Sequence, residues 1–101
     1  MSETAFKIKE NSWLAWVAAK KLGTSNVAIV LGSTIHLHNT TKEFFLQDTR
    51  WLKHEICHIR QFRQHGYIGF IVKYLWESIR RGYYNNRFEV EARIAEESGS
   101  V

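Results

Sequence analysis

The pattern of hydrophobic and polar positions predicts a helix near the start of the chain. Helical spacing of apolar residues covers about residues 11–22, with Asn11 or Ser12 as the N-terminal cap and Gly23 as the stop. The large apolar side chains share one side of this helix, which we expect to cover the core: Trp13, Trp16, Val17 and Leu22.

Two β-rich runs follow in the segment VAIVLGSTIHLHN. The Gly-Ser step between them is a signal for a two-residue hairpin. In the second run Ile35 and Leu37 alternate with His36 and His38, which predicts one buried and one outward face. These runs predict a small antiparallel sheet. His36 and His38 are interpreted as exposed residues, because no carboxylate accompanies them as a third metal ligand.

A longer helix is predicted from Asp48 or Thr49 to about Gln64, where Gly66 supplies a C-terminal stop. At 100° per residue, its apolar residues Leu52, Ile56 and Ile59 lie nearly opposite a polar stripe of His54, His58, Gln61 and His65. We interpret His65 as a helix-end residue. Cys57 is interpreted as a small helix residue and not as a nucleophile.

This helix carries the motif WLKHEICHIRQ, in which His54 and His58 are one turn apart with Glu55 beside them. Two imidazoles at this spacing can reach one zinc ion, and the adjacent carboxylate can take a proton from water activated by the metal. The alternative is a polar patch on a helix surface. A chance HExxH in such a chain has a probability of roughly 0.02. We favour the metal site, because the histidines face inward, where unliganded polar groups are costly.

Zinc needs a third protein ligand, and the last segment, YYNNRFEVEARIAEE, offers carboxylates. A helix beginning near Asn86 turns Glu89 and Arg93 to one face and Glu91 to another, and Glu89 is the better candidate. A capping box between Asn86 and Glu89 is the alternative that needs no metal. Between the two metal helices, the pattern predicts a connecting helix that packs through Ile68, Ile71, Leu75 and Ile79.

Composition narrows the class of protein. A chain of 101 residues that is 45% hydrophobic fits one domain, residues 1–101. The single cysteine excludes an internal disulfide. The net charge of +4 is scattered without a nucleic-acid recognition motif, so we expect no nucleic-acid partner. No apolar run approaches the ~20 residues of a membrane span, and the start is polar, which favours a soluble cytoplasmic protein without a membrane partner.

The segments LGSTIHLHN, WLKHEICHIRQ and YYNNRFEVEAR together resemble the gluzincin metallopeptidases, especially the short single-domain minigluzincins and related HExxHxxQ proteins. The resemblance covers about residues 24–97. It implies an α+β zincin-like fold with an N-terminal helix, a small antiparallel sheet, an active-site helix and a C-terminal glutamate helix. It also implies a zinc peptidase acting on peptide or protein substrates, with ligands His54, His58 and Glu89 and the general base Glu55.

The resemblance carries three further expectations. The strand TIHLH should be the sheet edge that borders the cleft. Tyr83 and Tyr84 are candidates for stabilising the oxyanion, although packing roles are the alternative. Related glutamate helices often read E-x-x-A-D, whereas this chain has Arg93 in place of the aspartate, so either Arg93 pairs with Glu89 or another group orients the imidazoles. The other readings left open are a latent or non-catalytic zincin domain that binds a partner, and a structural module without metal.

Overall fold

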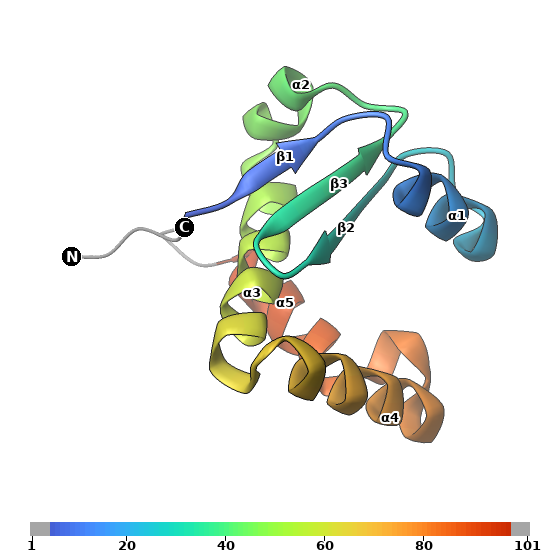
Figure 1. Cartoon of the computed structure of the whole chain (residues 1–101), viewed down its shortest axis with the longest axis vertical. Coiled ribbons are helices and arrows are strands. Elements are labelled where there is room, and N and C mark those ends of the chain that lie inside the picture. Colours follow the sequence, from blue (N-terminus) through green and yellow to red (C-terminus); the bar gives the residue numbers. More distant parts are fainter. Residues whose placement is uncertain (1–4, 98–101) are drawn as a thin grey trace.

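The computed structural model describes residues 5–97, which form an α+β fold (Figure 1). The predicted fold class is confirmed. The elements in chain order are β1 (Lys7–Lys9), α1 (Trp13–Leu22), β2 (Val27–Leu31), β3 (Thr34–His38), α2 (Lys42–Gln47), α3 (Thr49–His65), α4 (Tyr67–Asn85) and α5 (Arg87–Ala95). Within residues 5–97, no helix has the length and apolar character needed to cross a membrane.

The sheet has three strands in the order β1-β3-β2. The predicted hairpin is confirmed: β2 and β3 pair antiparallel, and Gly32 in the turn has a φ of 65°. A Cβ at Gly32 would meet the ring of Tyr67 at 3.2 Å, so both the positive φ and this close contact favour glycine at the turn. β1 was not predicted, because its three residues include only one apolar side chain, Ile8, and it pairs parallel with β3. The sheet is therefore mixed.

The expectation that TIHLH forms the sheet edge is wrong. β3 lies in the centre, between β1 and β2, because β1 covers its other side. The edge that borders the helices is β2, which contacts α1 and α3 (Figure 1).

The predicted helix that carries the HExxH motif is α3, and its boundaries are confirmed. The Asp48 side chain caps it by accepting a hydrogen bond from the Trp51 amide at 3.1 Å, and Gly66 follows its last turn with a φ of 79°. The apolar side of α3 packs against the sheet, where Ile59 meets Ile35 and Leu37 in the main core. In Figure 1, α5 lies beside α3, and α4 leads away from the C-terminal end of α3.

The predicted packing side of α1 is wrong. Its small residues Ala15 and Ala19 are buried against Val27, whereas the large apolar residues are exposed: Trp13, Trp16, Val17 and Leu22. Small side chains let the helix backbone approach the sheet closely, so this helix docks through alanine and not through tryptophan.

The predicted packing side of α4 is also wrong in large part. Ile71 packs against the core, but Ile68, Leu75 and Ile79 are exposed. The helix docks instead through Phe70 and Tyr74, whose rings pack against one another at a tilt, while Phe70 meets Phe88 edge to face. This helix carries apolar residues on two sides, and the aromatic side is the one that the core accepts.

Candidate metal centre

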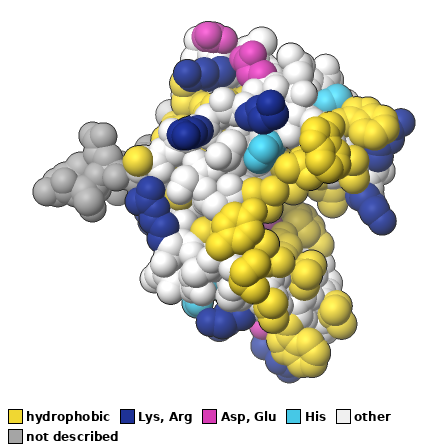
Figure 2. Space-filling view, in the orientation of Figure 1, with side chains coloured by type: hydrophobic (Ala, Val, Ile, Leu, Met, Phe, Trp, Pro, Cys, Tyr) yellow, Lys and Arg dark blue, Asp and Glu magenta, His cyan; other side chains and the backbone are white. Residues whose placement is uncertain are grey.

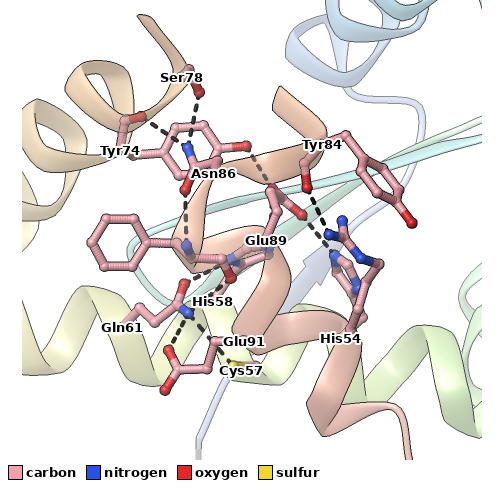
Figure 3. Close-up of polar contacts among 12 residues, drawn as sticks. His54, Cys57, His58, Gln61, Tyr74, Ser78, Tyr84, Asn86, Glu89 and Glu91 are labelled. Carbon is pink, nitrogen blue, oxygen red and sulfur yellow. Dashed lines mark hydrogen bonds and ion pairs between the residues drawn. The ribbon is translucent and has the colours of Figure 1, made fainter. Parts of the chain in front are cut away.

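Two histidines and one glutamate converge between α3 and α5 (Figure 3). The i,i+4 spacing on α3 places the rings of His54 and His58 with centroids 5.0 Å apart. Glu89, in the first turn of α5, directs one carboxylate oxygen to each ring: Oε1 lies 3.1 Å from His54 Nε2, and Oε2 lies 3.2 Å from His58 Nε2. The structure thus brings together the three residues predicted as ligands.

The donor atoms of these residues fit a zinc ion. They all lie within 4.8 Å of one another. Zinc bonds of about 2.0–2.2 Å at tetrahedral angles place neighbouring donors about 3.3 Å apart. Glu89 meets that spacing with a different oxygen for each imidazole: Oε1 for His54 and Oε2 for His58.

Each histidine ring is oriented through its other nitrogen. His54 Nδ1 donates to Glu96 Oε2 at 2.7 Å, and His58 Nδ1 donates to Gln61 Oε1 at 2.8 Å. A carboxylate oxygen and an amide oxygen can only accept, so these bonds place a proton on Nδ1 and turn Nε2 toward the site. Acceptors on the remote nitrogen are the usual companions of histidine ligands in metal sites.

Gln61 is itself fixed from α5. Its Nε2 donates to the Phe88 carbonyl at 3.1 Å and to Glu91 Oε1 at 2.6 Å, so its oxygen must face His58 (Figure 3). Gln61 is fully buried, where a misplaced amide would be costly. Glu91 therefore lies behind the site and supports its geometry, while Glu89 faces the histidines.

The choice between a third ligand and a capping box can be read from the contacts of α5. Asn86 caps the helix, because its side chain accepts from the Phe88 amide at 2.8 Å. Glu89 does not complete a reciprocal box; its carboxylate bonds His54, His58 and, at 2.5 Å, the Tyr74 hydroxyl. Asn86 therefore caps α5 without help from the Glu89 carboxylate, which is directed to the histidines.

The charges of the site shift several pKa values. Burial alone would lower the pKa of His54, but the hydrogen bond to Glu89 and the nearby carboxylates raise it to about 9. Burial would raise the pKa of Glu89, yet its bonds to the two histidines hold it well below the usual range. A divalent cation among these atoms would take the place of the protons that now balance the carboxylate charge.

Glu55 lies beside the three candidate ligands and lines the same cavity. It is buried, and this burial raises its pKa to about 7, although the two histidines act in the opposite direction. A carboxyl group with that pKa can both accept and release a proton near neutral pH.

The cavity measures about 310 Å³ and opens between α1, β2 and α4. Most of its lining is apolar, including Leu22, Val30, Phe70 and Leu75, and the polar groups gather where His54, Glu55, His58 and Glu89 reach it. An apolar enclosure with a few converging polar groups is typical of a ligand site.

Only one of the two candidate tyrosines lines this cavity. Gly82 interrupts α4 with a φ of 81°, and Tyr83 then turns toward Glu89. Burial, followed by the charge of Glu89, raises the pKa of Tyr83 to about 12, so its hydroxyl stays a donor. Tyr84 is occupied by Arg93, which donates to its carbonyl at 2.6 Å and lies over its ring at 3.9 Å. Arg93 therefore contacts Tyr84 and not Glu89. Glu96 and Gln61 orient the imidazoles of His54 and His58.

The remaining candidates lie away from the centre. His36 Nδ1 shares a hydrogen bond with Ser12 at the start of α1. His65 Nδ1 accepts from Lys73, and its ring packs on Phe70 and Phe88, as suits a helix-end residue. Burial raises the pKa of the Cys57 thiol to about 11, which disfavours the thiolate that a nucleophile needs.

Three functional groups were missed from the sequence: Gln61, Tyr74 and Glu96. Gln61 shares the helical stripe of His58, and Glu96 follows Glu89 by seven residues, which returns it to the same side of the chain's last turns. Those spacings were available as signals. Tyr74 offered none, since only the fold brings it to Glu89.

No protein-family model, curated protein or solved structure matched this chain. The resemblance to gluzincins therefore depends on the sequence segments LGSTIHLHN, WLKHEICHIRQ and YYNNRFEVEAR alone.

Proposed function

We propose that the chain is a zinc-dependent peptidase in which His54, His58 and Glu89 hold the metal and Glu55 is the general base. One observation carries the proposal: three potential zinc donors converge beside a buried carboxyl group, inside an apolar cavity. The resemblance to gluzincins assigns the same four roles.

The donor set favours zinc over harder cations. Two imidazole nitrogens and one carboxylate oxygen are typical of catalytic zinc, whereas calcium and magnesium take mostly oxygen ligands. Bound there, zinc would supply a polarising charge and lower the pKa of water toward about 7. Three protein ligands leave room for a fourth, exchangeable one, which is the arrangement that hydrolysis needs.

The chain's own groups then account for the proton transfers. Glu55, which lines the cavity beside the candidate ligands, takes a proton from the attacking water and delivers it to the nitrogen of the departing amine. The Tyr83 hydroxyl, which remains protonated, donates a hydrogen bond to the substrate carbonyl oxygen as that oxygen gains charge. His54 and His58 stay fixed because Glu96 and Gln61 hold their Nδ1 atoms.

The cavity walls suit a peptide with an apolar side chain near the cleaved bond. Apolar side chains such as Val30, Phe70 and Leu75 dominate the lining, and none of them offers a charge to recognise a charged substrate residue. β2 pairs with β3 on one side only, so alternate backbone groups on its outer side can bind an extended chain.

Zinc content and cleavage, measured on the same preparations, test the proposal. The protein is loaded with zinc, its metal content is measured, and it is incubated with a mixed peptide library analysed by mass spectrometry. We expect one zinc per chain and cleavage next to apolar residues. Glu55→Gln should keep zinc and lose cleavage, while the exposed control Glu43→Gln keeps both.

Two results would change the conclusion. Loss of zinc in Glu55→Gln would make Glu55 a ligand and not a base. Full zinc occupancy without cleavage by the unaltered protein would favour the alternative, a zincin-fold domain that binds a partner through the same cavity.

A further inference from the structure

Within residues 5–97, the two helices that flank the cavity leave a large apolar surface exposed. We call this surface the α1–α4 face and define it by six of the exposed apolar residues of the two helices: Trp13, Trp16, Leu22, Leu75, Trp76 and Ile79. Trp13 is 68% exposed, Trp76 58% and Ile79 78%. Figure 2 shows hydrophobic side chains gathered in a band that runs from α1 across the middle of the molecule and down α4. Contiguous apolar surface of this kind marks an interaction site.

The exposed charged side chains on these two helices are of one sign. Both helices lie wholly within the described residues, and their cations are Lys20, Lys21, Lys73, Arg80 and Arg81. Their only acidic residue, Glu77, is buried and pairs with Arg81 at 3.4 Å and with Arg87 at 3.8 Å. Every exposed charged side chain on α1 and α4 is therefore positive.

The cations lie next to the tryptophans. Lys20 Nζ is 5.1 Å from the centre of the Trp16 ring, and the Arg80 guanidinium is 5.9 Å from that of Trp76. Tryptophan beside lysine or arginine is the side-chain chemistry of the boundary between lipid tails and headgroups, where the ring enters the apolar layer and the cation meets phosphate.

We propose that the α1–α4 face binds the surface of an anionic phospholipid bilayer. The apolar side chains enter the headgroup boundary, and the flanking cations contact the lipid phosphates and carboxylates. This mode needs no spanning helix, so the absence of one within residues 5–97 does not oppose it. The sequence led us to expect no membrane partner, because the chain has no apolar run of spanning length and a polar start. Binding at the bilayer surface replaces that expectation. The bound protein would turn the mouth of the cavity toward chains at the bilayer surface.

Two other occupants fit the observations less well. A second copy of the chain on this face would bring like charges together, because no exposed acid lies on either helix to meet the lysines. A protein partner would have to cover three lysines, a residue type that is depleted in protein interfaces. Anionic lipid satisfies both the apolar band and the lysines.

Vesicle binding tests the proposal, with zinc absent and present, so that the outcome does not depend on peptidase activity. The protein is sedimented with vesicles of phosphatidylcholine alone or mixed with phosphatidylserine. We expect binding to the mixed vesicles that weakens as salt is added.

Two double variants separate the apolar and the charged contributions. Trp76→Ser with Ile79→Ser should weaken binding roughly ten-fold or more. Phe44→Ser is its control, because Phe44 is 59% exposed but lies on α2, at another part of the surface. Lys20→Glu with Lys21→Glu should weaken binding by roughly five-fold for each cation removed, and its control is Lys7→Glu with Lys9→Glu on β1.

Any one of three results would overturn the proposal. One is no binding to either type of vesicle by protein whose circular dichroism shows it folded. Another is equal binding by Trp76→Ser/Ile79→Ser and Phe44→Ser. The third is a dimer in analytical ultracentrifugation that Trp76→Ser/Ile79→Ser dissociates, without vesicle binding, which would assign the face to a second copy.

Discussion

Helices α3 and α4 follow one another in the chain but differ in the kind of side chain that departs from the usual burial: α3 buries polar side chains, and α4 exposes apolar ones. α3 buries Glu55, His58 and Gln61, whereas α4 exposes Trp76 and Ile79. The buried polar groups of α3 have partners within the chain; among the described residues, the hydroxyl of Thr40 is the one buried side-chain polar atom without a hydrogen bond. The polar side of α3 is thus satisfied within the chain, while the described residues leave the apolar side of α4 exposed.

Each helix departs from the ordinary rule at the place where we propose a function. Burying three polar side chains on one helix costs stability unless each is bonded, and a protein keeps such an arrangement where chemistry requires it. Exposing tryptophan and isoleucine side by side is costly in water and useful in contact with an apolar phase. The comparison separates the proposed metal site from the proposed membrane-binding surface.

The largest effect is expected where the polar arrangement depends on a single carboxylate. Glu89→Ala removes a proposed ligand and leaves both imidazoles without their shared partner, so zinc affinity should fall by more than about a hundred-fold. Competition with a chromogenic chelator measures it. In the matched variant Glu91→Ala only the support of Gln61 is lost, and affinity should fall no more than about ten-fold. The reverse order of effects would exchange the roles of the two glutamates.

The next effect concerns the hydroxyl of Tyr83, which α4 places in the cavity beside the polar groups. Tyr83→Phe should lower kcat by about a hundred-fold with KM nearly unchanged, because the hydroxyl is needed only as the carbonyl oxygen gains charge. Tyr84→Phe, next in the chain, should leave both constants unaltered, since Arg93 contacts its ring and carbonyl and not its hydroxyl. Equal effects of the two substitutions would remove Tyr83 from the mechanism.

A smaller effect tests whether the buried amide of α3 orients a ligand. Gln61→Met keeps the length of the side chain but deprives His58 Nδ1 of its acceptor, so zinc affinity should fall by about ten- to a hundred-fold. Glu96→Gln, which leaves an oxygen to accept from His54, should change affinity only a few-fold. Both are measured by the same chelator competition. An unchanged affinity in Gln61→Met would mean that the ring of His58 is held by packing alone.

Local signals in the sequence were sufficient for α3, because its ends are determined by neighbouring residues. The Asp48 cap and Gly66 mark its limits, and the positions of His54 and His58 follow from helical periodicity alone. The glycine turn likewise determined the hairpin. These two features depend on residues within a few positions of one another. The candidate ligand Glu89 lies 31 residues after His58 and was chosen from the face it occupies on the last helix and from the resemblance to gluzincins.

Features that depend on distant residues were missed. α1 and α4 each carry apolar residues on more than one side, and only the shape of the core decides that Ala15 and Phe70 enter it in place of Trp13 and Leu75. β1 is a strand because β3 offers it a partner, since its own three residues have little β character. Gln61 stood on the expected stripe, but its acceptors belong to α5, beyond the reach of any pattern within α3.

The last prediction makes the same substitution on the two helices, and the smallest effect of all is expected on α4. Ile59, on α3, is 0% exposed and packs in the main core, so Ile59→Ala should lower the free energy of unfolding by about 2–5 kcal/mol through lost burial and a residual cavity. Ile79, on α4, is largely exposed, so Ile79→Ala should change it by no more than about 0.5 kcal/mol, with alanine's better helix propensity offsetting the little contact that is lost. Urea denaturation of the chelator-treated protein measures both without the contribution of bound zinc. A large loss of unfolding free energy in Ile79→Ala would mean that the outer side of α4 is already covered in solution, by another part of the chain or by a second copy. The proposed difference between α3 and α4 would then be wrong. A negligible change, together with loss of vesicle binding when Trp76 is also replaced, would place the role of that side entirely in what it contacts outside the chain.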